Sequence, residues 1–246
     1  MHAISWHYAG QMIVTVGNTK GGIGKTTLAL QLALARQIAG GNVLLVDADR
    51  QGSAQTAVTL RAEAGRSPAL ACVQLAEGRL LRAQLGQLAA KYDDTVIDAG
   101  GRDNEALRVA LGRSDLLVVP VQPRAVDVWA LSDIAGLIDQ AQAAREDDDR
   151  PALRVLAVLN LADPGANPDT IEAGAALAEF PQLPLIEAVV RRRKAVANAM
   201  AHGLAVEELT PRDGKACEEI AALFSYVFNG KDMVNGNHKT IKAEQG

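Results

Sequence analysis

Several features that define other classes of protein are scarce in this sequence. It has two cysteines, Cys72 and Cys217, and no CxxC pair, which argues against a metal knuckle or a dithiol redox site. The net charge is −4, so any contact with nucleic acid must depend on a local cluster of cations. No apolar run approaches the roughly 18 residues of a membrane span, and the first residues lack a secretory signal pattern. We therefore expect a cytoplasmic protein in which both cysteines are small apolar filler.

Aromatic residues are also rare, at 3%, although apolar residues as a whole make up 48% of the chain. That composition suits helices packed on a hydrophobic sheet rather than an all-β sandwich. Strand patterns occur at residues 12–18, 42–49, 94–101, 115–123, 153–163 and 183–190. Helix patterns occur at residues 25–39, 55–66, 78–91, 104–111, 126–145, 168–179 and 215–228, with one more helix ending at Gly203. The strands are apolar along their whole length, which indicates parallel strands covered on both faces.

This order of elements predicts an α/β fold class, with a three-layer, doubly wound, mostly parallel sheet. No linker divides the alternating pattern, so we expect a single domain at residues 12–229. Residues 1–11 are expected to form a loose extension. Residues 230–246 are polar and predict a disordered tail, because they lack the apolar content of a packed core.

The stretch VGNTKGGIGKTTLAL, from Val16 to Leu30, carries the first functional signal. Its glycines follow a predicted strand and precede a predicted helix, where backbone N–H groups and the helix N-terminus can surround an oxyanion. Lys25 supplies a cation for the β- and γ-phosphates, and the Thr26 hydroxyl is a ligand for Mg²⁺. The predicted nucleotide-binding residues of the loop are Gly21, Gly22, Ile23, Gly24, Lys25, Thr26 and Thr27.

A second lysine, Lys20, lies five residues before Lys25. One cation is enough for the loop's own nucleotide, and a second at its rim repels the first unless a strong anion lies between them. A reasonable physical role for Lys20 is therefore to reach outward, to a nucleotide held by a second copy of the chain.

The stretch KGGIGKTT resembles the deviant Walker A loop of the ParA/MinD group of P-loop ATPases. In that group the first lysine crosses a dimer interface and contacts the partner's ATP. The resemblance implies ATP and Mg²⁺ as cofactors and an ATP-bound homodimer. It also implies a weak ATPase, which converts ATP to ADP and phosphate, with Lys20, Lys25 and Asp49 as the catalytic residues.

Two further stretches resemble motifs of the same group. VDADRQGS, at residues 46–53, resembles a second-strand motif in which Asp49 orients the attacking water and Asp47 supports the water shell of the metal. VIDAGGRD, at residues 96–103, resembles a Walker B segment in which Asp98 holds Mg²⁺ through water. The implied metal site is therefore Thr26, Asp47 and Asp98. Arg50 stands where the group usually has proline, which puts the local turn and the hydrolysis rate in question.

Three residues in the second half of the chain are candidates for contacts with the base. Asn160 ends a predicted strand and resembles the base-reading asparagine of the group. Pro211 and Asp213 lie in LTPRDG, where members of the group often place a loop that contacts adenine. A proline and an aspartate that simply form a turn explain this stretch equally well.

Four cations, Arg191, Arg192, Arg193 and Lys194, begin the helix that ends at Gly203. Positive charge at a helix N-terminus opposes the helix dipole, so the cluster indicates an external anion. The resemblance implies non-specific DNA as that anion, and a solvated surface cluster is the alternative. DNA affinity would then rise when ATP joins two copies.

The expected function is that of a ParA-like partition ATPase, cytoplasmic and associated with the nucleoid. It would position a plasmid or chromosome locus with a ParB-like partner that stimulates hydrolysis. One alternative is ParA-like positioning of a protein organelle or receptor cluster. Another is a MinD-like ATPase at a membrane surface, but the apolar face of EEIAALFSYVF, at residues 218–228, is better explained by a helix docked on the core. A metabolic enzyme of this fold would need a substrate pocket that the sequence does not reveal.

Overall fold

The computed structural model describes residues 11–101, 104–125, 127–165 and 168–230. The strands are β1 (Met12–Val16), β2 (Val43–Ala48), β3 (Ala71–Gln74), β4 (Asp94–Ala99), β5 (Leu116–Val121), β6 (Arg154–Ala162) and β7 (Leu185–Arg191). The helices are α1 (Lys25–Ile38), α2 (Ser53–Glu63), α3 (Gly78–Ala89), α4 (Asn104–Arg113), α5 (Val128–Asp147), α6 (Pro168–Ala178), α7 (Lys194–Ala201) and α8 (Gly214–Phe228). Two short 3-10 helices, η1 (Pro123–Ala125) and η2 (Val206–Glu208), complete the described elements.

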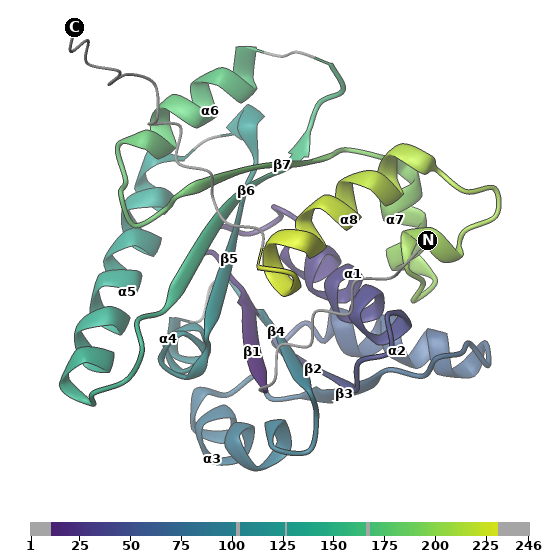
Figure 1. Ribbon diagram of the computed structural model, residues 1–246, viewed down its shortest axis with the longest axis horizontal. Coiled ribbons are helices and arrows are strands. Elements are labelled where there is room, and N and C mark those ends of the chain that lie inside the picture. Colours follow the sequence, from purple (N-terminus) through teal and green to yellow (C-terminus); the bar gives the residue numbers. More distant parts are fainter. Residues whose placement is uncertain (1–10, 102–103, 126, 166–167, 231–246) are drawn as a thin grey trace, which may run out of the picture.

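The strands form one seven-stranded sheet in the order β3-β2-β4-β1-β5-β6-β7, and every adjacent pair is parallel. β1 is central, between β4 and β5, so the chain leaves it toward one half of the sheet and later fills the other half (Figure 1). In open parallel sheets the crevice at the carboxyl ends of such central strands is the usual place for a ligand. The loop after β1 is the phosphate loop predicted from the sequence.

Helices cover both faces of the sheet, as the continuously apolar strands predicted. One core cluster joins α1, α2, α7 and α8 to side chains such as Val14 and Leu45. Leu44, the neighbour of Leu45, points to the other face and packs with α3 and α4. A third cluster joins α4, α5 and α6 to β5 and β6. The expected three-layer α/β fold is therefore confirmed, with both faces buried.

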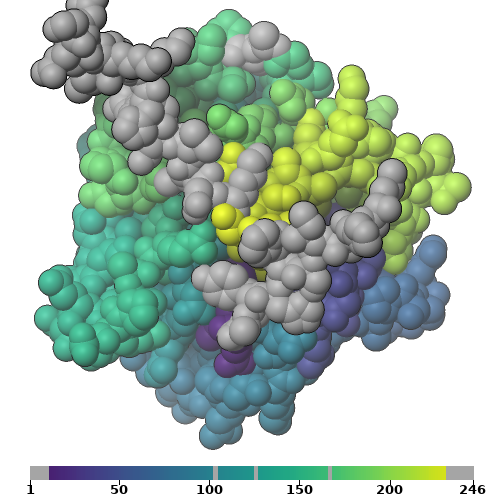
Figure 2. All heavy atoms as spheres, viewed as in Figure 1, coloured from purple at the N-terminus to yellow at the C-terminus, as the bar shows by residue number. Residues whose placement is uncertain are grey.

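The α8 helix bears on the membrane-surface alternative raised by the sequence. It packs against β7 and α1, and Ile220, Leu223, Val227 and Phe228 are buried in the core. Figure 2 shows the yellow outer side of α8 at the surface in the same view. Its apolar face is therefore already used within the domain. Among the described residues, no helix is long and apolar enough to cross a bilayer.

The sequence missed one strand. β3 (Ala71–Gln74) forms the edge of the sheet beside β2, in a stretch that had been assigned to neither a strand nor a helix. It has only four residues, ACVQ, and three of them are half-buried, so it lacks the apolar run that marked the others. Cys72 lies here and is a free thiol whose pKa burial raises to about 12, which fits the expected role of inert filler. The predicted extension (residues 1–11) and tail (residues 230–246) lie outside the described residues, except for Gln11 and Gly230.

Candidate functional site

A cavity of about 1030 Å³ opens at the carboxyl edge of the sheet, where β1, β2 and β4 end. Its wall combines the phosphate loop with the loops after β2 and β4, and with single residues from β6, from α7 and from the segment after β3. The lining residues are Gly21, Gly22, Gly24, Lys25, Thr26, Thr27, Ala48, Asp49, Arg50, Gln51, Ser53, Ala76, Gly100, Gly101, Leu161 and Met200. The structure thus brings together three segments that lie far apart in the sequence.

The phosphate loop has the backbone shape that its glycines allow. Gly22 and Gly24 have φ angles of 74° and 84°, in the left-handed region that disfavours other residues. A Cβ atom at Gly24 would also lie 2.5 Å from Asn160 Nδ2, so no side chain fits there. No side chain caps the N-terminus of α1, which leaves the N–H groups of its first turn to an external acceptor. This end of α1 is therefore arranged for a phosphate group.

Lys25 lies beneath that anion site and is 7% exposed. Its Nζ donates a hydrogen bond of 2.6 Å to the carbonyl oxygen of Lys20. Burial lowers the pKa of Lys25, although the nearby Asp98 and Asp49 carboxylates oppose the shift. The ammonium is thus largely desolvated and would gain strongly from the negative charge of a phosphate.

Asp98 supports the prediction of a metal site. It is the next-to-last residue of β4 and is 1% exposed. Burial raises its pKa to about 7, against an opposing hydrogen bond from Thr26. Asp98 Oδ2 is buried and has no hydrogen-bond partner among the described residues. Buried carboxylate oxygens in proteins almost always have a hydrogen-bond partner or a nearby ion. A hydrated cation next to Thr26 would supply one for Asp98 Oδ2. The Thr26 hydroxyl and Asp98 therefore fit Mg²⁺, which keeps much of its water and uses few protein ligands.

Asp47 and Asp49, at the carboxyl end of β2, differ in their surroundings. Asp47 is 0% exposed and does not line the cavity. Its two carboxylate oxygens accept hydrogen bonds from the backbone N–H groups of Asp49 and Gln55, at 3.1 and 2.9 Å. Burial raises the pKa of Asp47, and these hydrogen bonds act against that shift. Asp47 thus shapes the loop, whereas Asp49 lines the cavity, where a reacting water could be held.

Gly100 and Gly101, in the loop after β4, were not singled out from the sequence. A Cβ atom at Gly101 would lie 2.8 Å from Lys25 Nζ, and one at Gly100 would lie 3.1 Å from the Asp49 carboxyl carbon. The two glycines therefore let this loop close against both predicted catalytic groups. The paired glycines in VIDAGGRD were the available sequence signal, because consecutive glycines after a strand mark a close approach of the backbone. The other unpredicted wall residues, such as Met200, had no such signal.

The three residues predicted to read the base are not on the cavity wall. Asn160 is 2% exposed, and its Nδ2 donates a hydrogen bond of 2.6 Å to the carbonyl oxygen of Ile23. In this geometry Asn160 holds the phosphate loop from below. Asp213 caps α8, because its carboxylate accepts a hydrogen bond from the Ala216 backbone N–H, and Pro211 is exposed beside it. These contacts give Asp213 a structural role as a helix cap, whereas the alternative left open from the sequence was a simple turn.

Lys20 lies at the edge of the cavity, not inside it. Its Nζ is 3.8 Å from Asp127 Oδ2, and its side chain is 28% exposed. Asn18 Oδ1 accepts a hydrogen bond of 3.2 Å from the Lys20 backbone N–H, which holds the peptide in place. The two lysines therefore differ in position as the sequence suggested, with Lys25 below the loop and Lys20 at its rim.

The four predicted DNA-binding cations do not form one open patch. The carboxylate of Glu219, on α8, pairs with Arg191 at 3.0 Å and with Arg193 at 2.7 Å. Burial alone would raise the pKa of Glu219, but the hydrogen bonds from Arg193 and Arg191 outweigh it and lower the pKa. Arg192 and Lys194 are exposed. The prediction of four outward cations therefore needs correction, because two of them join β7 and α7 to α8.

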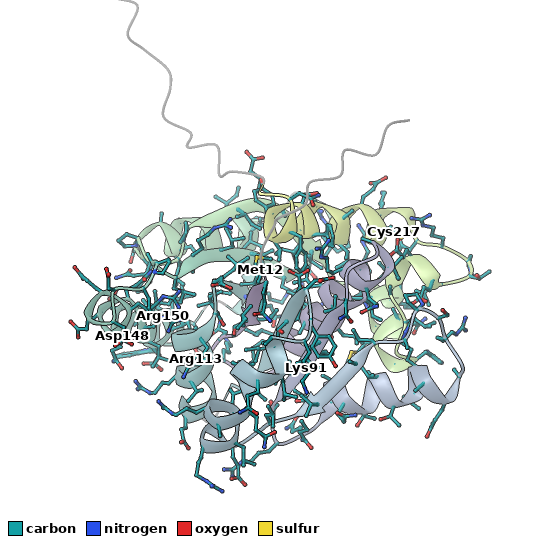
Figure 3. All side chains as sticks on the ribbon, turned by 60° about the horizontal axis from the view of Figure 1, so that its bottom comes forward. Met12, Lys91, Arg113, Asp148, Arg150 and Cys217 are labelled. Atoms are coloured by element: carbon teal, nitrogen blue, oxygen red, sulfur yellow. The ribbon has the colours of Figure 1, made fainter. Side chains whose placement is uncertain are left out.

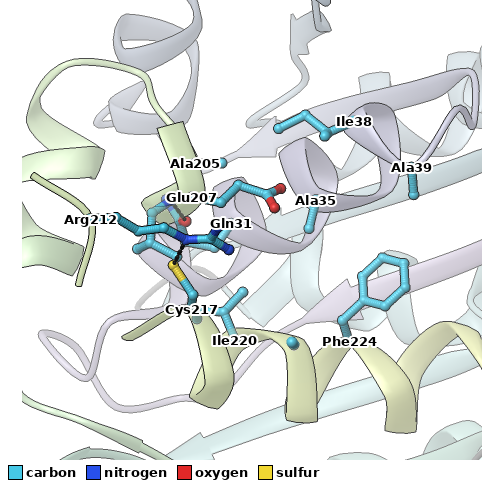
Figure 4. Close-up of a pocket in the computed structure, with 12 residues that line it drawn as sticks. Gln31, Ala35, Ile38, Ala39, Ala205, Glu207, Arg212, Cys217, Ile220 and Phe224 are labelled. Atoms are coloured by element: carbon cyan, nitrogen blue, oxygen red, sulfur yellow. Dashed lines mark hydrogen bonds between the residues drawn. The ribbon is translucent and has the colours of Figure 1, made fainter. Parts of the chain in front are cut away.

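A second, apolar cavity of about 280 Å³ lies between α1, η2 and α8 (Figure 4). It contains Arg212, whose Nε donates a hydrogen bond of 3.2 Å to Cys217 Sγ, and its wall includes Ile38 and Phe224. None of the predicted site residues lines it. Among the described residues there is also no cluster of three or more histidine, cysteine, aspartate or glutamate side chains that could hold a metal ion. The chemistry-bearing groups therefore gather at the first cavity.

Comparison with known sequences agrees with this geometry. The sequence profile described as CobQ/CobB/MinD/ParA nucleotide binding domain (CbiA) matches residues 14–206. The chain is 34% identical over 208 residues to a protein of Gloeobacter kilaueensis named maintenance of carboxysome distribution protein A, covering 84% of this chain and 88% of that protein. It is 32% identical over 171 residues to the chromosome-partitioning ATPase Soj of Thermus thermophilus, covering 59% of this chain and 67% of that protein.

Solved structures share the fold at lower identity. The complex of McdA with ATP from Cyanothece has a TM-score of 0.65 and 18% identity, and covers 91% of this chain and 98% of that one. The septum site-determining protein MinD from Pyrococcus horikoshii, in complex with Mg-ADP, has a TM-score of 0.64 and 21% identity, and covers 89% and 96%. At these identities the likeness concerns the arrangement of helices and strands.

Proposed function

Because the chain belongs to the CobQ/CobB/MinD/ParA nucleotide-binding family, we propose that it is a Mg²⁺-dependent ATPase whose ATP-bound form is a symmetric dimer that positions a cargo. Membership of the family confirms the resemblance first drawn from KGGIGKTT. The observation that carries the proposal is the contrast between the two lysines of the phosphate loop. Lys25 is buried below the anion site, and Lys20 stands at its rim.

The described residues support a division of labour in hydrolysis. Lys25 and the first turn of α1 would bind the phosphates, and Thr26 with Asp98 would hold Mg²⁺. Bound Mg²⁺ supplies charge neutralisation for the departing phosphate. Asp49 would accept a hydrogen bond from the attacking water and orient it for in-line attack. Arg50, in place of the usual proline, lines the same cavity and leaves Asp49 in position on its wall.

Lys20 would complete the site of the other copy. A cation that approaches the phosphates from outside stabilises the charge that develops during phosphoryl transfer, and such contributions are large in other nucleotide hydrolases. In a two-fold dimer each copy gives its Lys20 and receives its partner's, so nucleotide and dimer stabilise one another. Members of this family commonly dimerise with ATP, in agreement with this arrangement.

The cargo is assigned from the relatives. The relative that covers 84% of this chain is named for carboxysome distribution, and the one named for chromosome partitioning covers 59%. We favour a protein assembly as the cargo, with a partner protein that stimulates hydrolysis. A plasmid or chromosome locus, with a ParB-like partner, is the second candidate and is supported by the likeness to Soj.

Non-specific DNA is the proposed track for either cargo. Arg192, in the turn between β7 and α7, and Lys194, the first residue of α7, are exposed cations. Two such residues in each copy give four phosphate contacts per dimer. The logarithm of the DNA-binding constant should then fall with the logarithm of the salt concentration with a slope of about −4, against about −2 for a single copy. DNA affinity would therefore depend on ATP through dimerisation. A membrane track has less support, because the apolar face of α8 is buried.

Sedimentation of the Lys20→Ala variant tests the proposed dimer. We expect the parent protein to dimerise with Mg²⁺ and a slowly hydrolysed ATP analogue. The variant should remain monomeric at the same concentration, while its affinity for the nucleotide changes by less than about threefold because Lys25 is intact. A variant that dimerises as tightly as the parent would contradict the proposal.

DNA binding is tested separately. The double variant Arg192→Ala/Lys194→Ala should lose ATP-dependent DNA binding and keep ATP-dependent dimerisation. Its matched control is Lys91→Ala/Arg113→Ala, which removes two exposed cations from the edge of the sheet opposite the phosphate loop (Figure 3). Equal loss in both variants would show that overall charge, not the turn, governs DNA binding.

A further inference from the structure

The first turn of α5 exposes an unusually large apolar surface. Trp129 is 84% exposed and its neighbour Val128 is 52% exposed. Among the described residues only Leu60 and Ile171 are further large apolar side chains with high exposure, and they lie on other helices. Tryptophan is seldom left in water on a soluble domain without a binding role, because its ring is the largest apolar surface among the side chains.

Asp127 caps this turn, and two contacts join the turn to the phosphate loop. The Asp127 carboxylate caps α5, since Oδ1 accepts a hydrogen bond of 3.2 Å from the Ala130 backbone N–H. The other oxygen, Oδ2, is 3.8 Å from Lys20 Nζ. In addition, the Thr19 hydroxyl donates a hydrogen bond of 3.4 Å to the Ala130 carbonyl oxygen. The tryptophan is therefore positioned by the same residues that position Lys20.

We propose that Val128 and Trp129 form the apolar contact of the ATP-bound dimer, with a second copy of this chain as the occupant. The inference rests on the proposed function, in which Lys20 faces the other copy. A surface that hydrogen-bonds to the segment carrying Lys20 is then continuous with that interface. Aromatic side chains near the centre of an interface contribute most of the binding energy, and the charged contacts around them contribute specificity.

The charges beside the tryptophan disfavour other occupants. Asp127 precedes it, and the exposed Asp133 follows one turn later on the same helix. Carboxylates beside an aromatic ring repel both the phosphates of a single-stranded nucleic acid and the anionic head groups of a membrane. Arg124, the nearest arginine before this turn, is paired with Asp163 at 2.7 Å. A protein surface that supplies a cation, as the partner's Lys20 segment does, suits this turn better.

Symmetry makes the expected effect large. In a two-fold dimer each copy contributes one Trp129, so truncation of the side chain removes two contacts at once. Loss of one well-buried aromatic contact weakens an interface by at least about tenfold. The Trp129→Ala variant should therefore dimerise about 100-fold more weakly than the parent, while the monomer binds nucleotide normally because Lys25 and Asp98 are unchanged. Since Trp129 is exposed in one copy, its replacement leaves the fold intact.

Fluorescence offers a second, independent reading. The chain has two tryptophans, Trp6 and Trp129, so the Trp6→Phe variant reports on Trp129 alone. With Mg²⁺ and a slowly hydrolysed ATP analogue, the emission should shift to shorter wavelength and acrylamide quenching should fall. Both changes should occur at the protein concentration at which sedimentation detects the dimer. Leu60→Ala is the matched control, because it removes an exposed apolar side chain from α2, on the other side of the molecule from α5 (Figure 1).

The outcomes separate the two proposals. A dimer whose Trp129 is quenched as readily as in the monomer, or a Trp129→Ala variant that dimerises like the parent, would overturn the apolar contact and leave the ATP-bound dimer standing. Such a result would free the surface for a different protein partner. A parent protein that binds nucleotide but never dimerises would overturn both proposals, and sedimentation alone would reveal it.

Discussion

The two sides of the phosphate loop differ in every physical respect. Three residues lie below it and are between 1% and 7% exposed, namely Lys25, Asp98 and Asn160. Lys25 and Asn160 each donate a hydrogen bond to a backbone carbonyl of the loop, and Asp98 accepts one from Thr26, which follows the loop. Around its rim lie Lys20 and Trp129, which are partly or fully exposed. We call these two sets the floor and the rim.

The difference indicates two separate tasks. The floor is complete within one chain, because its hydrogen bonds and charges already hold the shape that a phosphate and a metal require. The rim gains contacts only when another surface arrives. Substitutions in the floor should therefore damage nucleotide binding by a single chain, and substitutions in the rim should damage assembly.

The largest expected effect comes from Lys25→Ala in the floor. It removes the lysine beneath the anion site and leaves Asp98 and Asp49 near the incoming phosphates. Nucleotide affinity should fall by about 100-fold or more, since truncation of one partner of a buried charge pair costs about 2–5 kcal/mol of binding energy. Titration with a fluorescent ATP analogue at a protein concentration that keeps the chain monomeric measures the effect.

Lys20→Ala is the control for that titration. The same charge is removed from the rim, only five residues away in the sequence. If both alanine variants lose nucleotide affinity to the same degree, the distinction between floor and rim fails.

A smaller effect is expected for Asn160→Ala. The substitution leaves the Ile23 carbonyl oxygen without its donor, which costs about 1–3 kcal/mol when the group is buried. The affinities for ATP and for GTP should then fall by the same factor, about tenfold or more, and the melting temperature should also fall. A change in the ratio of ATP to GTP affinity would instead restore the base-reading role that the sequence suggested.

The smallest effect in this series concerns the cationic turn outside the floor. Glu219→Gln should lower the free energy of unfolding by about 1 kcal/mol at pH 7, because Arg191 and Arg193 keep an acceptor but lose its charge. The folded-state pKa of Glu219 is lowered from 4.5, so its stabilisation is fully present above that pH. The difference between variant and parent should shrink as the pH falls below 4.5.

Urea unfolding at a series of pH values measures the effect of Glu219→Gln. The neighbouring Glu218 is exposed, and Glu218→Gln is the matched control, with little expected change at any pH. A loss of stability in Glu219→Gln that is the same at pH 4 and pH 7 would show that the ion pairs with the two arginines contribute nothing.

Much of the fold was accessible from the sequence, for physical reasons. The central strands are almost fully buried, so their apolar runs are continuous. As a result, β1, β2 and β4 lie within one or two residues of their predicted bounds. The edge strand β3 is only half-buried and carried no such signal. The site residues Lys25 and Asp98 could also be predicted, because each belongs to a short local motif that indicates its chemical role.

The contacts that the sequence could not reveal are those between distant segments. Glu219 lies 28 residues after Arg191, and nothing in either stretch announces that they pair. Asn160 was predicted to lie at the site, but its bond to Ile23 spans 137 residues and gives it a different partner. Trp129 attracted no attention as one aromatic residue in a helix, because exposure is a property of the fold and not of the residue.

Mixing two inactive variants tests the central claim most directly, namely that Lys20 serves the nucleotide of the other copy. Lys20→Ala lacks the rim lysine, and Asp49→Ala lacks the group that orients water. In a mixed dimer the Asp49→Ala chain would lend its Lys20 to the intact Asp49 site of the other chain. An equal mixture should therefore recover up to about a quarter of the parent ATPase rate, since about half the dimers are mixed and each has one complete site. A mixture no more active than the two variants measured separately would contradict the account, because Lys20 would then act only within its own chain.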